Sequence, residues 1–278
     1  MVLILGFTGV FGKLISLNTI ELVWYRMLIA FVTLFTFLVF KKELTKIKKK
    51  DFFGLLFVGS LVAVHWFFFF ESIKVSNVSV AVVCLSTASF FSALIEPLFL
   101  KRKAKLYEYL LGIIVFVTLF LMLEAEMKYT MGYVYGIIAS LLGTLFTLLN
   151  AKYINRLEAS KITMVEMLAG VIIFSIFMII NKSIGINDLK IDINDFIYLF
   201  LLGTICTAAV FVWMVEIMKY ISPYSLIMAI NLEPIYSIVL ALIIFSESEH
   251  MNLSFYIGAS VIILVVFIES FLKNKINS

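Results

Sequence analysis

The stretch FFFFESIKVSNVS at residues 67–79 decides the fold, because the chain repeats its outline as WMVEIMKYISPYS at residues 213–225. Each copy ends a long apolar run with a Glu-x-x-Lys pair: Glu71 and Lys74, then Glu216 and Lys219. Each pair is followed by a Ser-x-x-Ser motif. Two copies of one unit in a hydrophobic chain are typical of membrane transporters. The repeat therefore predicts a protein built from two related halves.

The composition places most of the chain in lipid. Of 278 residues, 63% are hydrophobic and 14% are charged, with a mean hydropathy of +1.11, whereas a soluble domain carries about 25% charged residues. The basic residues behind the net charge of +4 lie in short loops, unlike the single basic face of a nucleic-acid-binding domain. The spacing of the two cysteines and two histidines indicates no metal or redox site. We expect no cofactor and no nucleic-acid partner.

Charged and turn-rich segments divide the chain into ten apolar runs, and a spanning helix needs about 20 such residues. The predicted limits are 2–17, 20–40, 52–73, 76–100, 105–124, 131–153, 161–181, 194–217, 222–245 and 251–272. Lys and Arg concentrate in alternate connections, at 41–50, 101–105, 152–161 and 219, and in the tail at 273–275. Basic connections stay in the cytoplasm. We therefore expect a multi-pass protein of the cell (inner) membrane with both termini cytoplasmic.

Five runs in each half make the halves inverted relative to each other, because five is odd. The expected fold is an all-α polytopic membrane protein of two inverted five-helix repeats, residues 1–127 and 128–278. Aligning the halves matches charged residues: Lys13 with Lys152, Arg26 with Glu166, Glu71 with Glu216 and Lys74 with Lys219. Charge within a span is rare and costly, so these matches indicate duplication rather than chance.

The order and spacing of these features resemble the EamA-like branch of the drug/metabolite transporter superfamily over essentially the whole chain. The motifs are GFTGVFGK at 6–13, Trp24-Tyr25-Arg26, the two Glu-x-x-Lys ends, Leu232-Glu233-Pro234 and Gly258. The resemblance implies a secondary carrier of small metabolites that works by alternating access. The family often has a proline in the middle of the fourth span of each half. Pro234 supplies one, but Ala88 stands at the other place, so we expect the halves to bend differently.

Polar residues near the middle of the membrane are the candidate substrate contacts, because inverted-repeat carriers bind there. Glu233 lies beside Pro234 and close to Asn231. Its carboxylate suits a substrate amine or a coupling proton, and a structural hydrogen bond at a proline kink is an equal alternative. Thr87 is the counterpart of Glu233 in the first half, where a helix–helix hydrogen bond is the favoured interpretation.

Four aromatic side chains are further candidates for the substrate site. Trp66 could hold an amine by cation–π attraction or simply pack in the interior. His65 could relay protons or donate an interhelical hydrogen bond, and the second role is favoured. Trp213 and Tyr236 are the aromatic residues of the second half that we expect to face the cavity.

Six charged residues are candidates for gating: Glu71, Lys74, Glu216, Lys219, Arg26 and Glu166. An ion pair that forms only when one side is closed would act as a gate, and alternating access needs one at each side. The favoured alternative is a local i, i+3 pair at a helix end, which contributes only about 0.2–0.5 kcal/mol.

These features predict a secondary active or exchange transporter of a small organic metabolite, with an amino acid or another amine-bearing solute favoured and efflux as the expected direction. A channel or a non-transporting receptor is the alternative. No catalytic constellation and no P-loop is present, so we do not expect an enzyme. The expected partners are the substrate, the lipid bilayer and a coupling proton or counter-substrate. A monomer and a homodimer both remain open.

Overall fold

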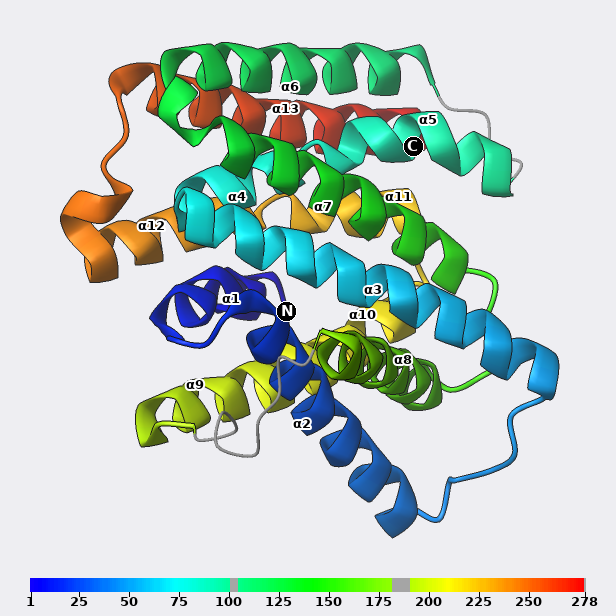
Figure 1. The fold of residues 1–278 in the computed structure, drawn as a ribbon. Coiled ribbons are helices and arrows are strands. Elements are labelled where there is room, and N and C mark those ends of the chain that lie inside the picture. The colour runs from blue at the N-terminus through cyan, green and yellow to red at the C-terminus, as the bar shows by residue number, and fades with distance from the viewer. Residues whose placement is uncertain (101–104, 182–190, 278) are drawn as a thin grey trace.

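The computed structural model describes residues 1–100, 105–181 and 191–277, and within these ranges the chain is helical and contains no strand (Figure 1). The helices of the first half are α1 Val2–Leu14, α2 Thr19–Phe40, α3 Lys49–Val75, α4 Val78–Leu85, α5 Ala88–Leu100 and α6 Leu106–Ala125. After the short η1 Met127–Tyr129 come α7 Thr130–Asn150, α8 Ala159–Ile180, α9 Ile193–Gly203, η2 Thr204–Ala209, α10 Val210–Ile217, α11 Pro223–Ile230, α12 Glu233–Phe245, η3 Ser246–Glu249 and α13 Leu253–Asn277. Residues 101–104, part of one predicted basic connection, lie outside the described ranges.

Eight described segments are long and apolar enough to cross a membrane. They are Thr19–Phe40, Lys49–Val75, Val78–Phe99, Leu106–Ala125, Met127–Asn150, Ala159–Ile180, Ile193–Ile217 and Pro223–Phe245. Two shorter apolar helices, Val2–Leu14 and Leu253–Ile268, coincide with the first and last predicted runs. The all-helical fold is confirmed, and the count of ten spans stays a prediction.

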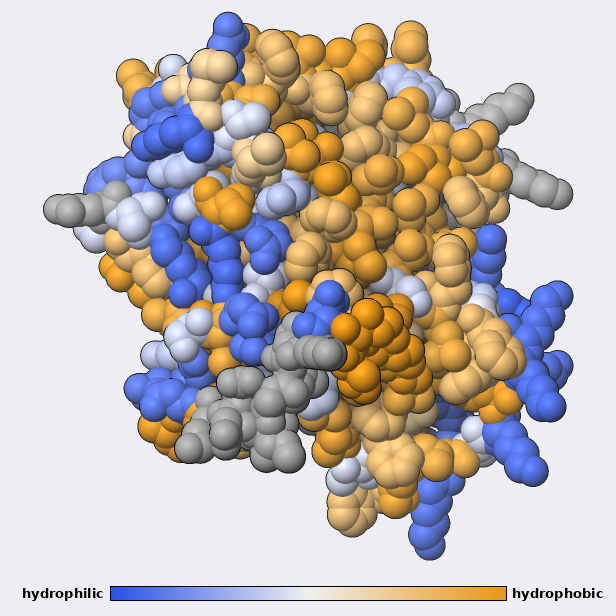
Figure 2. All heavy atoms as spheres, viewed as in Figure 1, coloured by the Kyte–Doolittle hydropathy of each residue, from blue (hydrophilic) through white to orange (hydrophobic). Residues whose placement is uncertain are grey.

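The bundle has two polar ends and an apolar middle. The connections after α3 and α12 lie at the left of Figure 1, and we call this side the Glu249 end. The connections after α2 and α7 lie at the right, and we call this side the Lys46 end. Figure 2 shows hydrophobic surface across the middle of this face, with hydrophilic residues gathered toward both sides. This distribution suits a protein whose middle lies in lipid.

The two halves interdigitate rather than standing side by side. Helix α3 packs along α7 and α8, and α2 packs along α8 and α9. At Gly59 of α3, an added Cβ would lie 2.5 Å from backbone atoms of Glu166 in α8. Only a residue without a side chain allows so close an approach. Elements of both halves therefore surround the centre of the bundle.

Two membrane-length segments are broken at their middle. The first changes from α4 to α5 at Ser86-Thr87, and the second changes from α11 to α12 at Asn231-Leu232. The Asn231 amide nitrogen donates to the Ser86 carbonyl at 3.5 Å, so the two breaks touch.

Both halves break at this place, although only one has a proline there, and the expected difference in bending between the halves stays a prediction. Pro234 has no N–H for the helix ladder and follows one break. The other break has no proline, but the Thr87 hydroxyl donates to the Cys84 carbonyl at 2.7 Å and so competes with the backbone for a helix acceptor. The repeated fold thus produces the same break by two different local chemistries.

Candidate functional site

A cavity lies beside the two helix breaks, in the middle of the bundle. Its empty volume is about 670 Å³, including space that is open to solvent. Its polar lining consists of Thr8, Arg26, His65, Ser140, Thr147, Asn231 and Glu233. Its apolar lining consists of Leu5, Trp66, Phe69, Leu85, Ala88, Gly143, Phe146, Phe211, Met214, Ile227 and Ile230. Four predicted contact residues, Glu233, Asn231, His65 and Trp66, are therefore brought together.

Glu233 is the acidic group of this cavity. It begins α12 directly after the break, and its residue is only 5% exposed. Within the described residues, neither of its carboxylate oxygens takes part in a hydrogen bond or an ion pair. The positive charge of Arg26 acts on this carboxylate, but a buried carboxylate without a hydrogen bond is costly. This position therefore suits a ligand that carries hydrogen-bond donors or positive charge.

Arg26 is the basic group of the same cavity, although the sequence indicated it only as a gating candidate. It belongs to α2 and is 1% exposed. Its guanidinium carbon lies 3.8 Å from the centre of the Trp66 ring and 5.5 Å from that of Phe70. Arg26 therefore covers one face of the Trp66 indole, and a cation–π role of Trp66 toward a substrate stays a prediction.

His65 lines the cavity as an anchored ring. Its Nδ1 lies 2.7 Å from the Ala139 carbonyl, and a carbonyl only accepts, so Nδ1 carries the proton. The ring stacks on Phe69 and meets Phe146 edge-on. This geometry fits the favoured interpretation of His65 as an interhelical donor between α3 and α7.

Three predicted substrate contacts do not reach the cavity. Trp213 and Tyr236 are 48% and 39% exposed on the outside of the bundle, and neither belongs to the cavity lining. Thr87 is fully buried, but its hydroxyl donates to the Cys84 carbonyl one turn earlier in the chain. In a membrane helix the lipid-facing side is as apolar as the interior, so sequence pattern alone could not assign the faces of Trp213 and Tyr236.

The two Glu-x-x-Lys motifs make different contacts. Glu216 and Lys219 form a local pair with 2.8 Å between Oε2 and Nζ, and both side chains are partly exposed. Lys74 instead donates to the Leu17 carbonyl in the connection after α1, so it joins two separate elements. Glu166 is fully buried in α8, with Asn150 as its polar neighbour.

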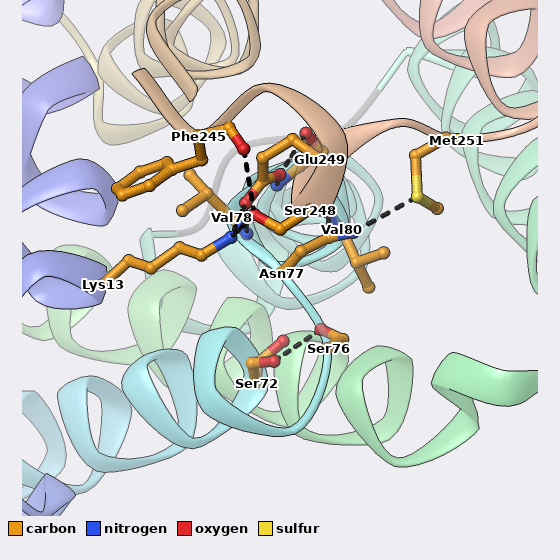
Figure 3. A network of polar contacts seen from close by, with 11 residues as sticks. Lys13, Ser72, Ser76, Asn77, Val78, Val80, Phe245, Ser248, Glu249 and Met251 are labelled. Atoms are coloured by element: carbon orange, nitrogen blue, oxygen red, sulfur yellow. Dashed lines mark hydrogen bonds and ion pairs between the residues drawn. The ribbon is translucent and has the colours of Figure 1, made fainter. Parts of the chain in front are cut away.

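A polar network that the sequence did not reveal joins elements at the Glu249 end (Figure 3). The fully buried Glu249 carboxylate accepts the N–H groups of Val78 and Ser79, each at 3.0 Å, and the Ser79 hydroxyl at 2.7 Å. The ammonium of Lys13 lies 2.7 Å from the same carboxylate. One side chain of η3 thus ties α1 and the start of α4 together.

Further polar contacts join elements at the Glu249 end. The Ser16 hydroxyl donates to Asp195 at 2.6 Å, linking the end of α1 to α9. The Asn252 N–H donates to Glu126 at 2.8 Å, linking the last helix to the α6–α7 connection. The acidic residues Asp195 and Glu126 could be seen in the sequence. Their partners could not, because sequence alone does not show which groups an acidic residue contacts.

The cavity lining includes residues toward both ends, with Arg26 and Phe69 nearer the Glu249 end and three others nearer the Lys46 end. Thr147 and Met214 lie near the last turns of α7 and α10, and Ile227 lies in α11, which begins at that end. A separate polar hollow at the same end is lined by basic side chains that include Lys46, Lys161 and Lys219. Within the described residues, no group of three or more His, Cys, Asp and Glu side chains could hold a metal ion.

Comparisons with known proteins bear on this architecture. A solved crystal structure of a protein superposes with a TM-score of 0.75, covering 98% of this chain and 94% of that one. Its sequence identity is 11%, so the likeness shows the fold alone. No curated protein sequence matches this chain. The family model described as the EamA-like transporter family matches residues 1–124 and 130–271. The resemblance in the motifs is thereby confirmed, and the chain belongs to the EamA-like transporter family of multi-pass membrane proteins.

Proposed function

We propose that this protein is a secondary transporter that moves a small amine-bearing metabolite by alternating access, with the central cavity as its substrate site. The observation that carries the proposal is a buried carboxylate, Glu233, which makes no hydrogen bond or close ion pair with described residues and lies in a cavity at two touching helix breaks. A carrier of this kind binds its substrate at broken helices in the middle of the membrane. The polar contacts that join α1, α4 and η3 at the Glu249 end support the same proposal, because a carrier needs contacts that can hold one end together.

The lining of the cavity supports an amine as the recognised group. The Glu233 carboxylate would pair with a substrate ammonium, and Asn231 beside it adds hydrogen-bonding capacity. The aromatic rings of Phe69, Phe146 and Phe211 would cover the apolar part of the substrate. An amino acid or another small amine is therefore the proposed cargo.

The proposed orientation comes from the basic connections at the Lys46 end. Ten spans with both termini in the cytoplasm would place that end at the cytoplasmic face of the cell membrane. Part of the cavity lining lies toward the same end, and loading from the cytoplasm, and hence efflux, is the proposed direction. Protease accessibility of terminal tags in intact and lysed cells tests the orientation, and tags cleaved in intact cells would contradict it.

Transport by the purified protein in proteoliposomes tests the function. Labelled amino acids, polyamines and quaternary ammonium compounds are offered to wild type, Glu233→Gln and Glu124→Gln. Glu124 is an exposed residue near the end of α6 and provides the matched control. We expect transport of at least one amine, a fall of at least tenfold in Glu233→Gln, and no change in Glu124→Gln. Undiminished transport in Glu233→Gln would remove Glu233 as the amine site.

Counterflow separates a carrier from a channel. Unlabelled substrate inside the vesicles accelerates uptake of labelled substrate by a carrier, because the carrier returns with substrate bound and so exchanges one molecule for another. Flux through a channel shows no such acceleration. We expect acceleration with the transported amine. A pH gradient imposed in the same vesicles distinguishes a coupling proton from a counter-substrate as the driving species.

A further inference from the structure

We infer that Arg26 is a carboxylate-binding residue and that the cavity takes a zwitterion, with the carboxylate of an amino acid at Arg26 and its ammonium at Glu233. This inference rests on the proposed function and adds a second charged subsite to it. Its basis is that Arg26 and Glu233 line one cavity, while no ion pair within 4.0 Å joins them among the described residues.

The guanidinium of Arg26 is held along one edge. Its Nε donates to the Thr207 hydroxyl at 2.6 Å. That hydroxyl donates its own proton to the Leu202 carbonyl, also at 2.6 Å, so toward Arg26 it can only accept. Thr207 belongs to the π-helical stretch η2, and such wide turns occur frequently at functional sites.

The end of the guanidinium opposite to that edge is left for a ligand. The Nη1 nitrogen is buried and has no hydrogen-bond partner. Two parallel N–H groups at this end match the two oxygens of a carboxylate. Stacking on Trp66 at 3.8 Å fixes the plane of the fork, so a carboxylate would meet a donor that is already oriented.

Charge balance favours a zwitterion over a simple amine. A cavity of mainly apolar lining holds one buried cation and one buried anion, which attract each other but form no ion pair within 4.0 Å. A buried charge is stabilised only when it is paired and hydrogen-bonded. An amine alone would leave Arg26 unpaired, and a carboxylate alone would leave Glu233 unpaired. A zwitterion satisfies both, with its side chain against the phenylalanine rings.

Affinities of matched compounds test the inference on the purified wild-type protein. L-leucine is compared with 3-methylbutan-1-amine, which lacks the carboxylate, and with 4-methylpentanoate, which lacks the amine. Alanine and phenylalanine are compared with their decarboxylated amines in the same way. We expect at least one amino acid to bind tenfold or more tightly than its amine. Amines that bind as tightly as their amino acids would overturn the inference and leave the proposed function standing.

Variants of Arg26 provide the second part of the test. Arg26→Gln should reduce the affinity for the amino acid to that for its amine, with the amine affected less than twofold. Arg26→Lys keeps the charge but loses the fork, so it should also lose most of the preference. Arg156→Gln at the Lys46 end, where Arg156 pairs with Asp51, should keep the preference. Absence of binding by every amino acid and every amine would overturn both the inference and the proposed function.

Discussion

The ammonium nitrogen of Lys13 lies 2.7 Å from Oε1 of Glu249, whose side chain is fully buried. The Glu249 carboxylate also receives two backbone N–H groups at the start of α4, where the helix dipole favours negative charge. A carboxylate with this many partners is stabilised despite burial. The contact therefore holds α1, α4 and η3 together at the Glu249 end.

A double-mutant cycle measures how strongly this contact holds that end. Lys13→Met, Glu249→Gln and the double variant are compared with wild type by thermal unfolding in detergent. We expect a coupling of about 0.5–3 kcal/mol, as for residues in one hydrogen-bonded network. Additive effects of the two substitutions would show that the ion pair contributes nothing to holding that end together.

The Glu216–Lys219 pair should matter far less than the contact of Lys13 with Glu249. Both of its side chains are partly exposed, and it lies within one helix end, so it contributes only about 0.2–0.5 kcal/mol. We expect Glu216→Gln to change the unfolding temperature little and transport less than twofold. Transport reduced tenfold, with the protein still folded, would instead assign this pair to a gate at the Lys46 end.

The sequence predicts the arrangement of the chain better than its contacts. Apolar run lengths and charged punctuation placed the helices to within a few residues, and the echo of Glu71-Lys74 in Glu216-Lys219 indicated the repeat. These signals can be seen in the sequence because they depend on neighbouring residues or on the spacing between the two repeats. The break at Asn231-Leu232 lies where Pro234 indicated a kink, but the break at Ser86-Thr87 was missed, because no proline marks it.

Sequence predicts those residues of the candidate site that are recognised by the cost of burying a polar group. It does not predict contacts that depend on how the helices pack. Glu233 and His65 stand out because a polar group in an apolar run needs an interior partner. Arg26 stood out as well, but its stacking on Trp66 depends on the approach of α2 to α3, which no sequence spacing encodes. Glu249 lies in a polar connection, where acidic residues are ordinary and nothing marks one as buried.

The hydroxyl of Thr207 should control the orientation of Arg26. Thr207→Val removes the acceptor of Nε and leaves a buried donor unpaired, which costs about 1–3 kcal/mol. We expect a lower unfolding temperature together with weaker substrate binding. Thr204→Val is the matched control, because the Thr204 hydroxyl is exposed and bonds only within its own helix. Equal effects of the two substitutions on binding would contradict a positioning role for Thr207.

Gly59 should be required for packing rather than for binding. A Cβ at this position would lie 2.5 Å from backbone atoms of Glu166 and 2.7 Å from the Ala169 Cβ, and backbone cannot move aside locally. We expect Gly59→Ala to destabilise the protein by about 1–3 kcal/mol, as overpacking does. Substrate affinity of the folded fraction should be unchanged. A variant as stable as wild type would show that α3 and α8 separate easily.

Gly143 should give the opposite result, because it lines the cavity. A Cβ at this position would lie 3.3 Å from the His65 ring, which is a tight contact. The larger side chain introduced by Gly143→Val would also fill part of the space proposed for the substrate. We expect Gly143→Val to weaken substrate binding at least tenfold while changing the unfolding temperature less than Gly59→Ala does. Binding assays and thermal unfolding on the two variants together check the contrast. If Gly143→Val binds substrate as wild type does, the substrate does not occupy the part of the cavity beside His65.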